Sequence, residues 1–168
     1  MRRAAALAAV ALLSGCGSAA KPAPPARTPA PAPSPAATAT PIAIAAADQP
    51  ACTGLYARLQ RVTLALSSSS ELIAQSVDKH DLSTRIATEH QQLERSAKLM
   101  DAGVVPAPLA PANRRLVKAL HAFARDFGRA EAPAKGGDFP GAVHAMTDQA
   151  VVTRIVAAAT TIEQACRG

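Results

Sequence analysis

The sequence predicts an all-α domain, an antiparallel up-down four-helix bundle over residues 48–168, behind a signal peptide and a disordered linker rich in proline and alanine. Apolar residues recur at helical spacing from Asp48 onward. No stretch alternates apolar and polar residues over a useful length, so strands are not expected. The connections between the periodic segments are short, which favours antiparallel neighbours.

The first helical segment opens at Asp48 and Pro50, two residues that are typical of a helix start. Four consecutive serines, Ser67–Ser70, interrupt its apolar face. They are either small packing residues within one long helix or the position of a kink. The apolar face comprises Leu55, Leu59, Val62, Leu66, Ile73 and Val77.

The second segment begins after His80-Asp81 and ends at Gly103, where we expect the C-cap because glycine often terminates helices. The proline-rich connector 104–108 leads to the third segment. Pro111 falls in the first turn of that segment, where proline is tolerated. The two apolar faces comprise Leu82, Ile86, Leu93, Ala97 and Met100, and then Leu109, Ala112, Leu116, Leu120, Phe123 and Phe127.

Residues 132–137 are predicted to separate the third helix from the fourth, which starts near Asp138 and is expected to be a single helix. Many of the core positions in the domain are alanines, and each buries little area, so the core should be thin. The apolar face of the fourth segment comprises Val143, Met146, Ala150, Ile155, Val156, Ala159 and Ile162.

Cys52 and Cys166 fall in the first turn of the first helix and the last turn of the fourth. An even-numbered antiparallel bundle brings these two ends together, and outside the cytoplasm the thiols should oxidise to a disulfide. The alternatives are two free buried thiols or a metal-bound pair. The metal-bound pair is disfavoured because the sequence has no CxxC motif and no nearby histidine at ligand spacing.

The N-terminus has the layout of an export signal in residues 1–15. Two arginines follow Met1, and an apolar run of ten residues, 4–13, comes next. This run is too short to cross a bilayer as a permanent helix. Small residues then lead directly to Cys16.

The sequence Leu13-Ser14-Gly15-Cys16 resembles the lipobox of bacterial lipoproteins. The resemblance implies that Cys16 receives a diacylglyceryl group and palmitate, and that cleavage before it makes Cys16 the first residue of the mature protein. The alternative is an ordinary secretory signal. Gly17 occupies the position where some two-membrane bacteria have an acidic retention signal, so that signal is absent. The protein is therefore expected to be lipid-anchored in the cell membrane or the outer membrane, with its domain on the extracytoplasmic side.

Residues 16–47 are expected to form a disordered linker that follows the lipidated cysteine. Nine of the fourteen prolines lie between Pro22 and Pro50, and only Lys21 and Arg27 are charged between residues 17 and 47. Such a segment buries too little apolar surface to offset its ordering entropy. A spacer that holds the domain away from the lipid headgroups is the favoured interpretation, and a proline-rich ligand for a partner domain is the alternative.

The formal net charge of +6 is concentrated outside the domain. Residues 1–47 carry four cations and no acid, so residues 48–168 hold fourteen Lys and Arg against twelve Asp and Glu. The chain has no Trp, one Tyr and three Phe, and it lacks the stacking residues of a single-strand binder. We therefore expect no nucleic acid partner. An envelope protein or a cell-wall component is the expected kind of partner, besides the membrane.

The histidines are the only candidates for a metal or acid–base site. Bundle metal sites usually show Glu-x-x-His or His-x-x-x-His on facing helices, and neither pattern occurs. Solvated histidines are the favoured interpretation, with no metal and no cofactor. The alternative is a metal site assembled in space from His90, Glu94 and His121.

Two other clusters have a functional interpretation beside a structural one. The basic cluster is either a solvated face or a site for an acidic polymer or lipid headgroups. Phe123 and Phe127 are either core residues or the wall of a hydrophobic ligand pocket with Tyr56 at its rim. The basic cluster comprises Arg114, Arg115, Lys118, Arg125 and Arg129.

No motif for catalysis accompanies these features. The serine run has no G-x-S-x-G context, and no glycine-rich phosphate loop is present. The sequence is similar in composition to small Ala/Pro-rich envelope lipoproteins, a similarity that implies no activity. We expect a non-enzymatic, membrane-anchored lipoprotein with a structural or interaction role. The alternative is an extracytoplasmic binding module for a metal ion or a small apolar ligand.

Overall fold

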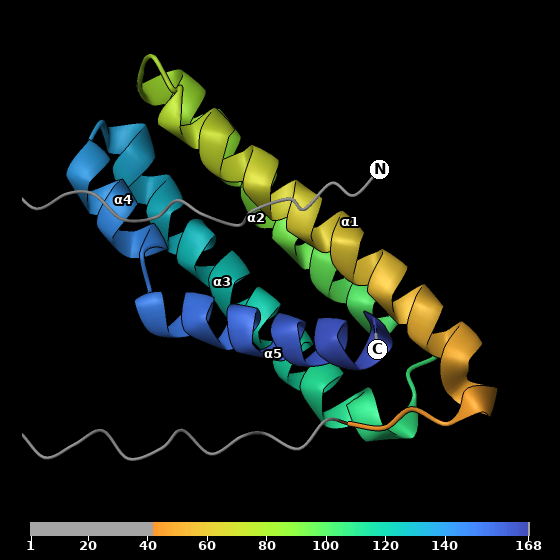
Figure 1. The fold of residues 1–168 in the computed structure, drawn as a ribbon. Coiled ribbons are helices and arrows are strands. Elements are labelled where there is room, and N and C mark those ends of the chain that lie inside the picture. The colour runs from red at the N-terminus through yellow and green to blue at the C-terminus, as the bar shows by residue number, and fades with distance from the viewer. Residues whose placement is uncertain (1–41, 168) are drawn as a thin grey trace, which may run out of the picture. The chain divides into compact units, whose positions relative to one another are not determined.

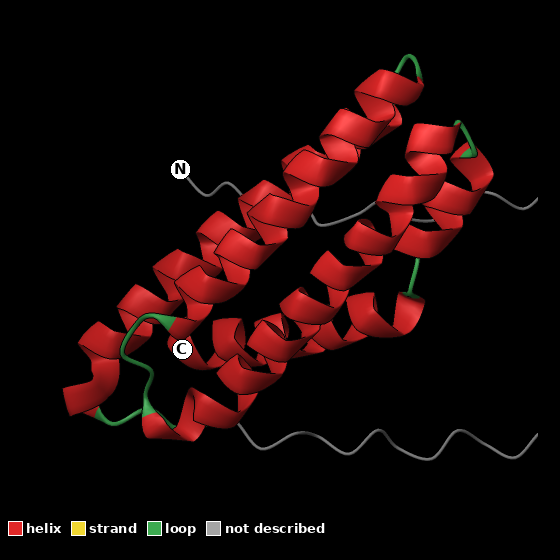
Figure 2. Ribbon diagram, turned by 180° about the vertical axis from the view of Figure 1, so that it is seen from behind, coloured by secondary structure: helices red, strands yellow, loops and turns green. Residues whose placement is uncertain are grey.

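The structure, a computed structural model, describes residues 42–167, apart from the side chains of residues 69–72 and 74. Every regular element in this range is a helix, which confirms the all-α prediction (Figure 1, Figure 2). The predicted signal peptide, Cys16 and the linker up to residue 41 lie outside the described residues. The helices are η1 (Ala46–Asp48), α1 (Gln49–Ala74), α2 (Lys79–Asp101), η2 (Ala107–Leu109), α3 (Ala110–Gly136), α4 (Phe139–Met146) and α5 (Gln149–Arg167).

Helix α1 runs without interruption through the four serines, so these residues lie within one long helix. The Ser67 hydroxyl donates to the Thr63 carbonyl at 3.0 Å, and the Ser68 hydroxyl donates to the Ala65 carbonyl at 2.9 Å. Such bonds to the preceding turn satisfy short polar side chains inside a helix. Val77, predicted to face the core, lies beyond the end of α1 and is 86% exposed.

Helix α2 begins at a side-chain cap. Asp78 Oδ1 accepts a hydrogen bond from the Asp81 N–H at 2.8 Å, which satisfies one of the free donors of the first turn. The C-cap is Ala102, so the prediction that Gly103 caps this helix was wrong. The predicted apolar face is fully buried: Leu82, Ile86, Leu93, Ala97 and Met100.

Helix α3 extends through most of the predicted break at 132–137, with Pro133 inside its last turns. The chain leaves the helix at Gly137, which has a φ of 83°. There the Gly137 N–H donates to the Ala134 carbonyl at 3.1 Å, and the Asp138 N–H donates to the Pro133 carbonyl at 2.9 Å. One left-handed glycine therefore makes the turn that the sequence analysis spread over six residues.

The predicted fourth helix is interrupted at Thr147 and Asp148, so its single-helix prediction was wrong. Asp138 caps α4 by accepting from the Gly141 N–H at 2.9 Å. Asp148 caps α5 in the same way, with the Ala150 N–H at 2.9 Å. A capping aspartate starts a new helix because its carboxylate takes up donors that lack a helical partner.

The interruption changes which side chains of this region are buried. Val143 and Val156 were predicted in the core but are 50% and 57% exposed, and Ala150 is exposed as well. The break rotates the second half of the segment relative to the first, so one continuous helical period does not describe both. The buried apolar residues of α4 and α5 are Ala142, Met146, Val151, Ile155, Ala158 and Ile162.

Helix α3 is the central element: it packs most extensively on α2 and also contacts α4 and α5. The Asn113 amide at the start of α3 donates to the Met100 carbonyl at the end of α2. Near the other end of α3, Glu131 lies beside His90 of α2, so α2 and α3 run in opposite directions. Figure 1 shows α1 beside α2, and α5 lying obliquely across α3.

The packed part of the described chain begins before Asp48. Ile42 and Ile44 are partly buried against the core, although both fall in the segment expected to be linker. Within residues 42–167 we find no helix with the length and apolar character needed to cross a membrane.

Candidate functional site

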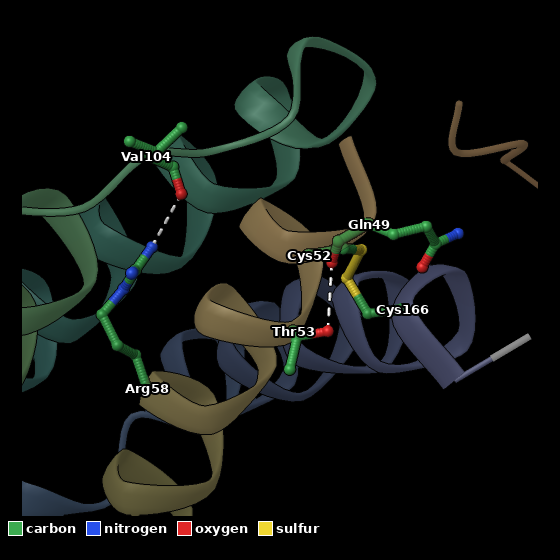
Figure 3. Close-up of a disulfide and its surroundings, with 6 residues drawn as sticks. All are labelled: Gln49, Cys52, Thr53, Arg58, Val104 and Cys166. Atoms are coloured by element: carbon green, nitrogen blue, oxygen red, sulfur yellow. Dashed lines mark hydrogen bonds between the residues drawn. A yellow bond between two sulfur atoms is a disulfide. The ribbon is translucent and has the colours of Figure 1, made fainter. Parts of the chain in front are cut away.

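A disulfide links Cys52 of α1 to Cys166 of α5 (Figure 3). The two Cα atoms are 5.4 Å apart although the cysteines are separated by 114 positions in the sequence. This pairing confirms the predicted disulfide. Cys52 is fully buried. The bridge therefore ties the first helix of the packed body to its last helix.

Tyr56 lies at this end of the molecule. The Arg167 guanidinium is 6.0 Å from the centroid of its ring. The Glu163 carboxylate, 2.7 Å from Arg167 Nη1, raises the pKa of that guanidinium. From the sequence, Tyr56 was placed at the rim of a possible ligand pocket beside Phe123 and Phe127. Tyr56 does not line the groove that the structure has beside Phe127, so this placement was wrong.

Two histidine–carboxylate pairs join α2 to α3. His90 Nδ1 lies 3.0 Å from Glu131 Oε1, and His121 Nδ1 lies 3.0 Å from Glu94 Oε2. These side chains are between 28% and 37% exposed. His90, Glu94 and His121 therefore do not form the single metal site considered as an alternative. His121 pairs with Glu94, whereas His90 pairs with Glu131. In the described part of the chain no three His, Cys, Asp or Glu side chains are arranged to hold a metal ion.

A cavity of about 600 Å³ opens between α3 and α5, and we call it the basic groove. Three members of the predicted basic cluster, Arg115, Lys118 and Arg125, line this groove. Arg154 of α5 also lines it, although it was not part of the predicted cluster. Arg114 does not line the groove, and Arg129 forms an ion pair with Asp126. The lining residues are Arg115, Lys118, Ala119, Ala122, Arg125, Arg154, Ala157, Ala158 and Thr161.

A second cavity of about 480 Å³, the apolar groove, lies where the end of α1 and the start of α2 meet α3 and α4. Phe127 lines it, and Phe123 packs edge-on against Phe127 with 5.1 Å between the ring centroids. The predicted pocket beside this pair therefore includes Phe127 but is not lined by Phe123. The lining residues are Ile73, Ser76, Leu82, Phe127, Phe139, Val143, Met146 and Thr147.

No protein-family model, no curated protein and no solved structure matches this chain.

Proposed function

We propose that this protein is a bacterial envelope lipoprotein with a non-catalytic structural or interaction role. In this proposal residues 1–15 direct export, Cys16 carries the lipid, and the segment from residue 17 up to Ile42, where the packed body begins, spaces the helical body from the membrane. The body faces the extracytoplasmic side of the cell membrane or the outer membrane. Its helices follow an up-down antiparallel order, with α4 and α5 together as the fourth segment.

The observation that carries this proposal is the disulfide between Cys52 and Cys166. Structural disulfides persist in exported proteins and are rare in the reducing cytosol. The disulfide is consistent with export, which the resemblance of residues 13–16 to a lipobox also implies. A diacylglyceryl group on Cys16 would give stable attachment, because two acyl chains hold a protein at a membrane whereas one binds only marginally.

The interaction role is supported by the two surface grooves, which offer a partner different chemistries. The basic groove presents guanidinium and ammonium groups, and the apolar groove presents Phe139 and Val143. An envelope protein or a cell-wall component is the proposed partner.

The test of the anchor is fractionation of cells that express the full chain or its Cys16→Ala variant. We expect the parent protein to stay in membranes after a carbonate wash and the variant to be released. Mass spectrometry of the N-terminal peptide should show Cys16 as the first residue with an acyl-bearing adduct. A Cys52→Ala/Cys166→Ala variant serves as the control, because it removes two cysteines and should keep the anchor. Retention of Cys16→Ala in washed membranes would contradict the proposal.

A second candidate function is the binding of a small apolar ligand in the apolar groove. Large apolar side chains are partly exposed there: Phe139 is 41% and Val143 is 50% exposed. A volume of about 480 Å³ falls within the usual size of small-molecule sites. The metal-ion version of this alternative has less support, because the histidines pair with carboxylates in two separate places.

The neutral fluorophore N-phenyl-1-naphthylamine tests this second candidate. We expect its fluorescence to rise with the parent protein and the rise to be lost in Val143→Glu, which places a charge in the groove. Val156→Glu is the matched control, because Val156 is similarly exposed but lies on α5 outside the groove. Equal responses of the two variants would rule out this site.

A further inference from the structure

The basic groove concentrates positive charge from two helices. Arg115, Lys118 and Arg125 come from α3, and Arg154 comes from α5. No carboxylate lines the cavity, and none of these four side chains has an ion pair within residues 42–167. Like charges around one cavity raise the local potential, and a bound anion would relieve their repulsion.

The wall between these cations is made of small side chains. Ala119 and Ala122 of α3 face the groove together with Ala157 and Ala158 of α5. Short side chains on both helices leave the space of about 600 Å³ open, a volume typical of sites for small molecules. They also give the groove an apolar surface, so its occupant needs an apolar part as well as a charge.

The number of cations in the groove favours a phosphate, with its higher charge, over a carboxylate. Three of the four groups are guanidinium groups, whose planar N–H donors can bind phosphate oxygens in pairs. A phosphate monoester carries close to two negative charges near neutral pH and several acceptor oxygens, so it can engage more than one arginine. The Thr161 hydroxyl already donates to the Ala157 carbonyl at 2.9 Å, so the donors available to the anion are those of the cationic side chains. No aromatic side chain lines the groove, so nothing there would stack on a nucleobase.

We propose that the basic groove binds an amphiphilic phosphate, a phosphate ester joined to a short apolar body. The phosphate lies between Arg154 of α5 and the cations on the α3 wall, and the apolar body rests on the alanines. The proposal goes beyond the role of envelope lipoprotein and does not depend on Cys16 being acylated.

The test uses the full-length oxidised chain with Cys16→Ala, so that no acyl chain of the protein itself can enter the groove. Isothermal titration measures binding of dihexanoyl phosphatidic acid below its micelle concentration. Two comparison ligands separate the contributions: inorganic phosphate has the charge alone, and dihexanoyl phosphatidylcholine has the same chains with a neutral headgroup. We expect the phosphatidic acid to bind more tightly than either.

Two variants locate the site. Arg115→Gln/Arg154→Gln removes one cation from each wall and should weaken binding at least about tenfold, as the loss of charged hydrogen bonds implies. Arg61→Gln/Arg95→Gln is the matched control, because it removes the same charge from exposed residues of α1 and α2 outside the groove. It should leave the affinity nearly unchanged. Ala157→Glu places a carboxylate at an exposed position of the groove wall and should abolish binding while the circular dichroism spectrum stays the same.

Each opposite result would overturn the proposal. Absence of binding, or equal weakening in both double variants, would show that no specific site exists in this groove. Equal affinity for inorganic phosphate would show that the alanine wall takes no part. Binding to vesicles that contain phosphatidylglycerol without binding to the short-chain ligand would indicate adsorption to an anionic surface instead.

Discussion

The guanidinium group of Arg58 lies against Gly103. Arg58 Nη2 donates to the Val104 carbonyl at 3.0 Å, which joins α1 to the connector after α2 (Figure 3). A Cβ atom on residue 103 would overlap this guanidinium. Gly103 therefore leaves room for the close approach of the Arg58 side chain and is not the helix cap that was expected from the sequence.

Gly103→Ala should lower the free energy of unfolding by about 1 kcal/mol, because Arg58 must move and lose its hydrogen bond to Val104. In an Arg58→Ala background the same substitution should cost almost nothing. Urea unfolding of the four proteins in this cycle measures the coupling. Additive effects would show that the two residues do not interact.

Gly54→Ala is the matched control near the same guanidinium. Its Cβ would lie 3.8 Å from Arg58 Nη1, an ordinary contact. Because alanine favours a helix interior, this substitution should raise stability by about 0.5–1 kcal/mol.

Reduction of the Cys52–Cys166 disulfide should lower the melting temperature. The bridge closes a loop across 114 positions, and the chain-entropy model assigns about 4–5 kcal/mol to a loop of that length. Thermal unfolding with and without reductant measures the effect. The Cys52→Ala/Cys166→Ala variant is the control, since its melting temperature should not respond to reductant. An unchanged melting temperature of the parent protein on reduction would remove the role of the disulfide as a staple.

Gly137→Ala should destabilise the protein by about 1–2 kcal/mol, because a residue with a Cβ is strained in the left-handed conformation. The φ of Gly137 is 83°, and its Cβ would meet only Lys79 Cδ at 3.7 Å, so the cost comes from the backbone. Gly136→Ala is the adjacent control: nothing lies within 4 Å of its added Cβ. Chemical unfolding should show a lower free energy of unfolding for Gly137→Ala and an unchanged one for Gly136→Ala.

Asp81 should titrate below its ordinary range. The hydrogen bond from Arg85 Nε to Asp81 Oδ1, 2.7 Å long, and a second bond from the Val77 N–H lower the pKa of Asp81 from its ordinary value of 3.8. The ionised carboxylate therefore stabilises the fold above pH 3.8, and this contribution is lost as the pH falls through the lowered pKa.

Arg85→Gln should move the pKa of Asp81 upward, and an NMR titration of the carboxyl carbon would measure it. Arg95→Gln is the control on the same helix, about 15 Å further along its axis, and should leave the Asp81 titration unchanged. A pKa of Asp81 that does not respond to Arg85→Gln would contradict the assigned cause.

Local pattern predicted much of the fold. The apolar face of α2 is buried as the helical period requires, whereas the helix begins at Lys79, before the predicted start after His80-Asp81. The disulfide followed from the positions of Cys52 and Cys166 at the two ends of the helical region. The buried face depends on neighbours in the sequence, and the disulfide was predicted by assuming an even number of antiparallel helices.

The break before α5 was missed although a local signal exists. Asp148 stands directly before an apolar run, as a capping residue does, and the predicted apolar positions jump by five residues from Ala150 to Ile155, which does not continue the helical period. Val143 and Val156 are exposed in the two short helices, and in one uninterrupted helix these residues, 13 positions apart, would have pointed to nearly opposite sides.

The sites required the packing of helices that are distant in the sequence. Nothing local indicates that Arg154 shares a groove with Arg115, or that His90 lies beside Glu131 rather than Glu94. A helical period determines which side chains share one face of a helix, and it sets the caps and turns at the ends. The crossing angle and register between two helices decide which faces meet, and these depend on how the side chains of the whole body pack together. The amino-acid pattern therefore determined the helices and their staple, and the tertiary packing decided where charge and open space come together.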